Sequence, residues 1–195
     1  MTDETISSSC LNGLRQRDPD QWRRFARVYS PLVYEWCRRA RIPAHDSADI
    51  VQETFGAVSE RIDSFRRDQL GDSFQGWLWG IARHKILDHF RMLAKHPVAA
   101  GGSSAQQMLN QLPELLAESP TQNDLAQDRQ LVVRRALELL KSDFEDRTWR
   151  AFCRLVMENV DAKTVANELG MTPGAVYNAK YKVLRRLREE FSELL

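Results

Sequence analysis

Apolar residues recur every three or four positions along most of this chain, which is the spacing of one face of an α-helix. The first long segment of this kind opens at Pro19 or Asp20 and closes at the Ile42-Pro43 pair. Its apolar positions are Trp22, Phe25, Tyr29, Val33, Trp36 and Ala40. No segment alternates apolar and polar residues over a useful length, so we predict an all-α fold.

Two more helices are predicted in the first half of the chain. Asp46 or Ser47 is the expected cap of the earlier one. Its apolar side carries Ile50, Val51, Phe55, Val58 and Ile62. The later one is expected to begin near Asp72 or Ser73, to keep its core positions on one stripe, and to end at about Lys95.

The pattern changes between residues 96 and 128. The His96-Pro97 pair is expected to stop the preceding helix, and Gly101-Gly102-Ser103-Ser104 has the composition of a flexible linker. The leucines between residues 108 and 116 could form one short amphipathic helix. We therefore predict two small helical domains, residues 1–95 and 129–195, joined by a flexible acidic linker over residues 96–128.

The second domain contains the signals of a helix-turn-helix. Asp161 is the expected cap of its first helix, and Gly170 falls where the turn needs a residue that tolerates a positive φ. Thr172-Pro173 is a cap followed by a proline at the first helical position. Ala166 and Val176 are the expected apolar contacts between the two helices. The same spacing also occurs in ordinary helix pairs.

A basic tail favours the DNA-binding interpretation of this helix pair. The second helix continues through cations with no acid among them: Lys180, Lys182, Arg185, Arg186 and Arg188. A capped helix with such a tail is suited to a major groove, where cations face the phosphates.

Charge is distributed unevenly over the 195 residues, although the net charge is only +1. Residues 1–95 carry 15 Lys/Arg and 13 Asp/Glu, residues 96–128 carry four acids and no Lys/Arg, and residues 129–195 carry 13 Lys/Arg and 10 Asp/Glu. Two mildly basic domains thus flank an acidic linker. Because phosphate neutralisation supplies most non-specific affinity, the chain alone is expected to bind DNA weakly.

The remaining sequence signals point to a cytoplasmic protein without catalytic chemistry. The three cysteines are scattered, and neither an apolar signal core nor a membrane-spanning run is found. No phosphate loop, nucleophile motif or metal-spaced cluster is found either, and His84 and His89 are too far apart for two ligands on one helix face. We predict no catalytic residue, no metal and no cofactor, and the protein is not expected to be an enzyme.

Three segments, in this order, resemble a bacterial RNA polymerase sigma factor of the extracytoplasmic-function (ECF) group. Residues 46–55 are similar to the polymerase-binding helix of that family, and residues 74–91 to its promoter-melting helix. The helix-turn-helix is similar to its reader of the upstream promoter element. Two positions depart from the family: His84 stands where asparagine is common, and Ala179 where a basic residue is frequent. Both face DNA in the family, so the promoter sequence cannot be carried over.

The resemblance assigns polymerase binding to Asp49, Gln52 and Glu53, which share one helix face because they are three and four positions apart. In the family this face docks on a coiled coil of the largest polymerase subunit. On the sequence alone, the same residues are also explained as a solvated acidic first turn that favours the helix dipole.

Contact with the downstream promoter element is assigned to a group of aromatic and basic residues around the third helix. An exposed tryptophan beside cations suits single-stranded DNA, because bases stack on aromatic rings while cations hold phosphates. For Trp79, packing against another helix is the alternative. The predicted residues are Phe65, Arg66, Arg67, Trp79, Arg83, His84 and Lys85.

Upstream recognition is assigned to the outward face of the second helix of the helix-turn-helix. Asn178 is suited to adenine, Lys182 to guanine or phosphate, and the arginines to phosphate. The predicted residues are Thr172, Ala175, Tyr177, Asn178, Tyr181, Lys182, Arg185 and Arg186.

The sequence therefore indicates a sigma factor that binds core RNA polymerase and promoter DNA, and it leaves open an anti-sigma factor as a further partner. No membrane partner is expected. Two alternatives remain at this point. One is a one-component helix-turn-helix regulator with a helical sensor domain, which would bind a palindrome as a dimer. The other is a helical interaction adaptor, in which the basic tail has no role in DNA binding.

Overall fold

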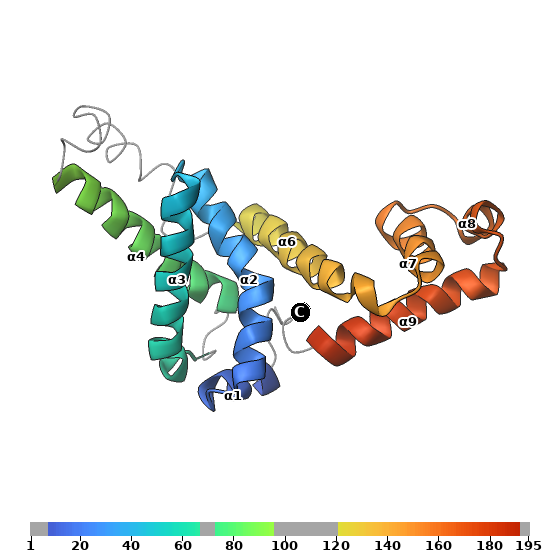
Figure 1. Cartoon of the computed structure of the whole chain (residues 1–195), viewed down its shortest axis with the longest axis horizontal. Helices are drawn as coiled ribbons and strands as arrows, with labels where there is room; N and C mark the ends of the chain where they lie inside the picture. Colours follow the sequence, from blue (N-terminus) through green and yellow to red (C-terminus); the bar gives the residue numbers. More distant parts are fainter. Residues whose placement is uncertain (1–7, 67–72, 96–120, 192–195) are drawn as a thin grey trace. The chain divides into compact units, whose positions relative to one another are not determined.

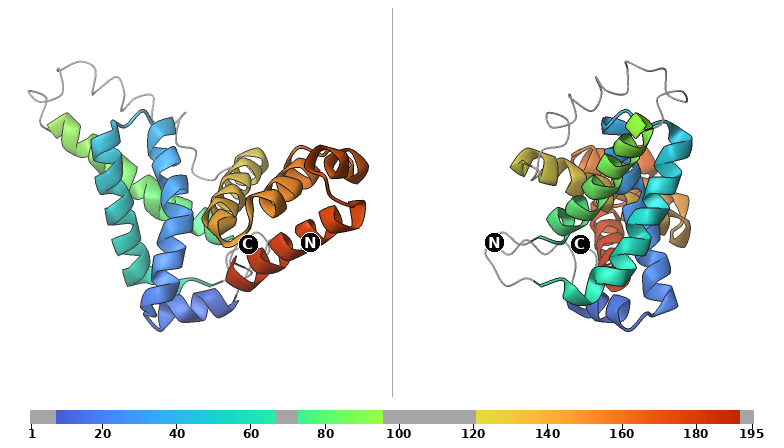
Figure 2. Two further views of the ribbon diagram at one scale, coloured as in Figure 1. Left: turned by 45° about the vertical axis from the view of Figure 1, so that its right-hand side comes forward. Right: turned by 90° about the vertical axis from the view of Figure 1, so that its left-hand side faces the viewer.

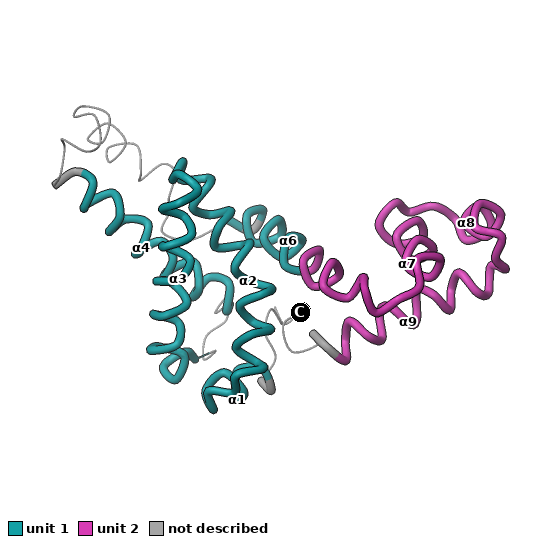
Figure 3. The backbone as a smooth tube through the Cα atoms, in the orientation of Figure 1, with its two compact units in different colours: residues 1–132 teal, residues 133–195 magenta. Residues whose placement is uncertain are grey.

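The computed structural model describes residues 8–66, 73–95 and 121–191, and these ranges are helical with no strand. The predicted all-α class is therefore confirmed. The chain divides into two compact units, Met1–Val132 and Val133–Leu195, coloured teal and magenta in Figure 3. The proposed amphipathic helix between residues 108 and 116 and most of the predicted linker lie outside the described residues.

Three long helices build the first unit. Helix α1 spans Ser8–Arg15, α2 spans Pro19–Arg39, α3 spans Ala44–Arg61 with a short 3₁₀ turn η1 at Ile62–Ser64, and α4 spans Phe74–Lys95. Helices α2 and α3 run side by side, and α4 packs against both of them (Figures 1 and 2). The start of α6, which spans Gln122–Leu140, also belongs to this unit.

Aromatic rings fill the core between these helices. Phe25 of α2 lies 4.9 Å from Tyr29, 5.2 Å from Phe55 of α3 and 5.6 Å from Phe74 of α4, measured between ring centroids. Phe25, Tyr29 and Phe74 are each fully buried. Close aromatic pairs add to the gain from burying large apolar surfaces, so this cluster joins all three helices into one unit.

Helices α2 and α4 begin where the sequence predicts, at Pro19 and after Ser73, whereas the cap of α3 is Pro43 and not the expected Asp46 or Ser47. Asp18 caps α2, since its Oδ1 accepts hydrogen bonds from the amides of Asp20 (2.8 Å) and Gln21 (3.0 Å). Helix α3 begins at Ala44, so Asp46 and Ser47 lie within its first turn rather than at its cap. Ser73 does precede α4 as predicted, and its Oγ accepts from the amide of Gly76 at 2.9 Å.

The second unit contains the end of α6 and the helix-turn-helix. The 3₁₀ turn η2 at Lys141–Asp143 leads into α7, Asp146–Phe152, which continues as a π-helical turn η3 at Cys153–Met157. Helices α8, Ala162–Leu169, and α9, Pro173–Phe191, complete the unit. Helix α9 packs against both α7 and α8.

Helix α6 begins inside the range that the sequence assigned to the linker. Its residue Asp128 is 2% exposed and fixes it to α2 in the first unit. The Trp36 indole N–H donates to Asp128 Oδ2 at 2.8 Å, and Arg39 Nη1 donates to Oδ1 at 3.1 Å. A buried carboxylate is tolerated only with such partners. The domain boundaries themselves stay a prediction.

We expect Asp128→Asn to become relatively more stable than the wild type as the pH rises. Burial raises the pKa of the Asp128 carboxyl above its usual 3.8, opposed by the hydrogen bond from Trp36 and the charge of Arg39. A raised folded-state pKa contributes stability that is present at low pH and lost as the pH rises through it. Urea unfolding of both proteins from pH 3.5 upwards measures this, and a pH-independent difference between them would contradict it.

Candidate functional site

The local geometry of the helix-turn-helix follows the sequence signals closely. Asp161 Oδ1 accepts hydrogen bonds from the amides of Lys163 (3.0 Å) and Thr164 (3.1 Å), which caps α8. Gly170 ends α8 in the left-handed conformation, with a φ of 60°. Thr172 Oγ1 accepts from the amide of Ala175 at 3.2 Å and caps α9. These three predictions of cap and turn are confirmed, and so is Pro173 as the first residue of α9.

Small apolar side chains hold the two helices of this motif together. Val176 is fully buried, and Ala166 is 2% exposed in the same cluster. The predicted contact between the helices is therefore confirmed. Two arginines outside the motif support it from α7 and η3: Arg147 donates to the carbonyl of Gly170, and Arg154 donates to Glu168 at 2.6 Å.

The outward face of α9 displays most of the residues predicted to read the upstream element. Thr172, Tyr177, Asn178, Tyr181, Lys182 and Arg185 are exposed, and Ala175 is half-buried. Lys180 and Lys182 form no ion pair with the described residues. Arg185 pairs with Glu189 at 3.3 Å, and its guanidinium lies 5.9 Å from the ring centroid of Tyr181. The face therefore combines cations, an amide and two aromatic rings.

Two positions of α9 are less available than the sequence indicated. Ala179 is 3% exposed and belongs to the core of the motif, so the expectation that this position faces DNA is wrong. A basic residue there would have to be accommodated in the apolar cluster. Arg186 is half-buried, and its Nε donates to Asp143 Oδ2 at 3.0 Å. Its charge is already partly compensated within the unit.

The acidic face of α3 is presented to solvent in the first unit. Asp49, Gln52 and Glu53 are all exposed. On the opposite side, Ile50 is 4% exposed and the ring of Phe55 packs on Phe25. The predicted division of this helix into a polar outer face and an apolar inner face is confirmed.

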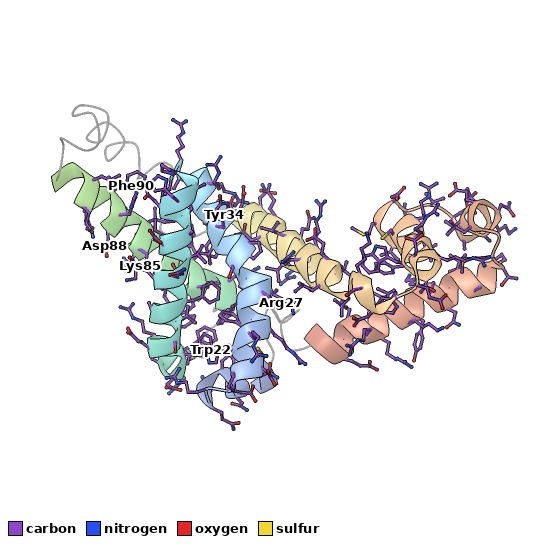
Figure 4. The ribbon with its side chains drawn as sticks, in the orientation of Figure 1. Trp22, Arg27, Tyr34, Lys85, Asp88 and Phe90 are labelled. Atoms are coloured by element: carbon purple, nitrogen blue, oxygen red, sulfur yellow. The ribbon has the colours of Figure 1, made fainter. Side chains whose placement is uncertain are left out.

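Glu53 of this face also has an intramolecular partner. Its Oε2 lies 3.3 Å from Nζ of Lys85, labelled on α4 in Figure 4. The sequence assigned these two residues to different functions, polymerase binding and DNA binding. The structure brings them together, so the two candidate surfaces meet at this ion pair.

Two aromatic residues expected to contact unpaired DNA are buried instead. Trp79 is 8% exposed, and its ring lies 5.2 Å from Trp36 in an edge-on arrangement. Phe65 is 4% exposed and packs 5.1 Å from Trp77 and 5.5 Å from Phe74. The expectation of an exposed Trp79 is wrong, because α4 packs on both α2 and α3 and buries more than one stripe.

The basic residues of this group differ in accessibility. His84 is exposed, whereas Arg83 and Lys85 are half-buried. Arg66 is exposed, and its Nη1 donates to the carbonyl of Asp63 at 2.6 Å. Arg67 lies outside the described residues. Arg66 and His84 are therefore the most accessible members of the group that the structure describes.

The described ranges contain neither a candidate metal site nor a membrane-spanning helix. No group of three histidine, cysteine or carboxylate side chains there could hold a metal ion. None of the described helices has the length and apolar character needed to cross a membrane. Asp46 lies between two histidines, with its Oδ1 2.9 Å from His45 Nε2 and its Oδ2 3.7 Å from His89 Nε2.

A capped helix-turn-helix whose second helix carries a basic outward face is typical of DNA-binding proteins. The family model for Sigma-70 region 2 matches residues 25–96, which cover most of α2, all of α3 and α4. The ECF RNA polymerase sigma factor ShbA of Streptomyces griseus is 28% identical over 165 residues, which cover 81% of either chain. The ECF RNA polymerase sigma factors SigD of Mycobacterium tuberculosis and Mycobacterium bovis are 26% identical over 180 residues, 89% of this chain and 78% of theirs. The chain therefore matches Sigma-70 region 2 over residues 25–96 and is similar to ECF sigma factors over most of its length.

Proposed function

We propose that this protein binds core RNA polymerase and directs it to specific promoters, where transcription then initiates. The observation that carries this function is the match to Sigma-70 region 2 over α2 to α4, in a chain that continues into a helix-turn-helix. It would act as a specificity subunit and not as an enzyme, and it would work in the cytoplasm where polymerase is found.

The exposed surfaces divide the work between the two units. Asp49, Gln52 and Glu53 on α3 would dock on polymerase, since carboxylates and an amide on one face can pair with basic groups. Arg66 and His84 would approach the downstream promoter element. The outward face of α9 would enter the major groove of the upstream element, because its helix is capped, basic and free of acids until Glu189.

Two other functions remain to be separated by experiment. A one-component regulator would bind its operator without polymerase, and a helical adaptor would bind no DNA in either condition. Run-off transcription with purified core polymerase tests the proposal directly, and gel shift with and without core polymerase separates the two rivals. Specific transcripts only in the presence of both proteins are the expected result. A regulatory partner such as an anti-sigma factor would bind the α3 or the α9 surface. Co-purification with this protein would identify such a partner.

We expect Arg185 and Arg186 to differ in how strongly they contribute to DNA binding. Arg185→Ala should reduce the slope of log affinity against log salt by about one, because one phosphate contact is lost. Arg186→Ala should reduce it less, since Arg186 is half-buried and held by Asp143 of η2, whereas Arg185 is exposed and its partner Glu189 is an exposed residue of the same helix. Titrations of the holoenzyme on promoter DNA at several salt concentrations measure both slopes. Equal slopes for the two variants would contradict the assignment.

A further inference from the structure

Two large aromatic side chains are left in solvent on the face of α9 that is proposed to read DNA. Tyr177 and Tyr181 are 58% and 59% exposed, among the most exposed large hydrophobic side chains of the described residues. They are four positions apart, so both rings lie on one face of the helix. Tyrosine combines an apolar ring with a polar tip and is enriched where a surface becomes covered by a partner.

The surroundings of the two rings indicate a polyanionic partner. Lys182 is exposed beside them, and the guanidinium of Arg185 lies 5.9 Å from the Tyr181 ring centroid. A cation at this distance is attracted to the ring and restricts its motion. A partner for this face must therefore present negative charge at the edges and an apolar group at the centre.

The major groove of DNA offers that combination. Phosphates line its edges, and the C5-methyl group of thymine is the apolar group that a base pair displays on its floor. We propose that Tyr177 and Tyr181 recognise thymines of the upstream element through their methyl groups. This inference rests on the proposed function, because it requires α9 to lie in the groove.

The residue between the tyrosines completes the same recognition. Asn178 is exposed on this face, and its amide matches the N6 and N7 atoms of adenine. A thymine methyl on one strand and an adenine edge on the other belong to the same type of base pair. The face therefore reads A·T pairs, with the tyrosines and the asparagine contacting different partners of those pairs.

A phosphate contact through the tyrosine hydroxyls would use the same residues for a different purpose. Methyl recognition and phosphate contact depend on different parts of the tyrosine side chain. Methyl recognition needs the ring and survives Tyr→Phe, whereas a phosphate contact needs the hydroxyl and is lost in Tyr→Phe. Methyl recognition also depends on a group that can be removed from the DNA without changing its hydrogen bonds, since uracil is thymine without the methyl.

The experiment uses the full chain in complex with core polymerase. The holoenzyme first selects its preferred upstream element from a randomised pool, and each thymine of that element is then replaced singly by uracil. Wild-type affinity should fall about fourfold at each contacted thymine, the effect of one buried methyl group. Tyr177→Phe and Tyr181→Phe should keep this thymine-to-uracil ratio, and each Tyr→Ala variant should lose it at one position.

Lys180→Ala is the matched control, since it removes an exposed cation of α9 while both tyrosine rings and the Asn178 amide remain. It should weaken binding to all duplexes while leaving the ratio unchanged. Equal wild-type binding to thymine and uracil at every position would overturn the inference, and so would Tyr→Phe variants as weak as Tyr→Ala. A holoenzyme that selects no upstream sequence at all would instead overturn the proposed function.

Discussion

Trp79→Ala is expected to destabilise the first unit by about 3–5 kcal/mol, the usual cost of removing a large aromatic side chain from a core. Trp79 is 8% exposed and packs edge-on against Trp36 at 5.2 Å. Its removal leaves a cavity beside a tryptophan whose indole N–H is committed to Asp128. Urea unfolding followed by circular dichroism measures the loss.

His84→Ala is the control for this variant, because His84 lies on the same helix and is exposed. Its effect on stability should stay within about 0.5 kcal/mol, as for most surface substitutions. Trp79→Phe should retain most of the packing and most of the stability. A fully stable Trp79→Ala protein with a specific defect in promoter opening would return Trp79 to the role of a base-stacking residue.

Elements fixed by neighbouring residues could be predicted from the sequence. The cap at Asp161, the left-handed turn at Gly170 and the cap at Thr172 each depend on residues within three or four positions of one another. Local hydrogen bonds and backbone preferences determine such features, and these are visible in the sequence. The order of the helices was predictable for the same reason, because apolar spacing is itself local.

The side of a helix that is buried depends on how many neighbours it has, and this cannot be deduced from the helix alone. A single apolar stripe along α4 contains Trp77, Leu78 and Ile81 and leaves Trp79 outside it. Because α4 contacts both α2 and α3, its buried surface extends around to Trp79. In the same way, Ala179 was assigned to DNA although α9 turns this position toward α8 and the core.

Ion pairs between residues that are far apart along the chain also could not be predicted from the sequence. Lys85 and Glu53 are 32 residues apart along the chain and yet form an ion pair at 3.3 Å. Arg186 and Asp143 pair at 3.0 Å in the second unit. Neither pair has a helical spacing, so only the packing of α3 on α4 and of α9 near η2 reveals them. These ion pairs matter for function because each partly neutralises a charge that the sequence assigns to binding polymerase or DNA.

Reversing the charge of Asp49 and Glu53 together is expected to weaken binding to core polymerase by about 30-fold, equivalent to ~2 kcal/mol. Both carboxylates are exposed, so they face a partner and not the core. Lysines in their place would face the basic groups that the carboxylates are proposed to meet, and like charges across an interface are costly. Fluorescence titration of labelled protein with core polymerase measures the affinity.

Folding of the Asp49→Lys, Glu53→Lys protein should be nearly unchanged, because exposed charges contribute less than about 1 kcal/mol. The Glu53→Lys substitution also breaks the ion pair with Lys85, and this loss could weaken binding by itself. The substitution Lys85→Glu separates the two causes. Adding Lys85→Glu to Glu53→Lys re-forms an ion pair of reversed polarity, yet binding should stay weak if polymerase senses the charge at position 53. Asp20→Lys with Glu138→Lys makes the same change in net charge on α2 and α6 and should bind normally. Wild-type affinity of the Asp49→Lys, Glu53→Lys protein would show that this face of α3 is a solvated helix surface and that polymerase docks elsewhere on the protein.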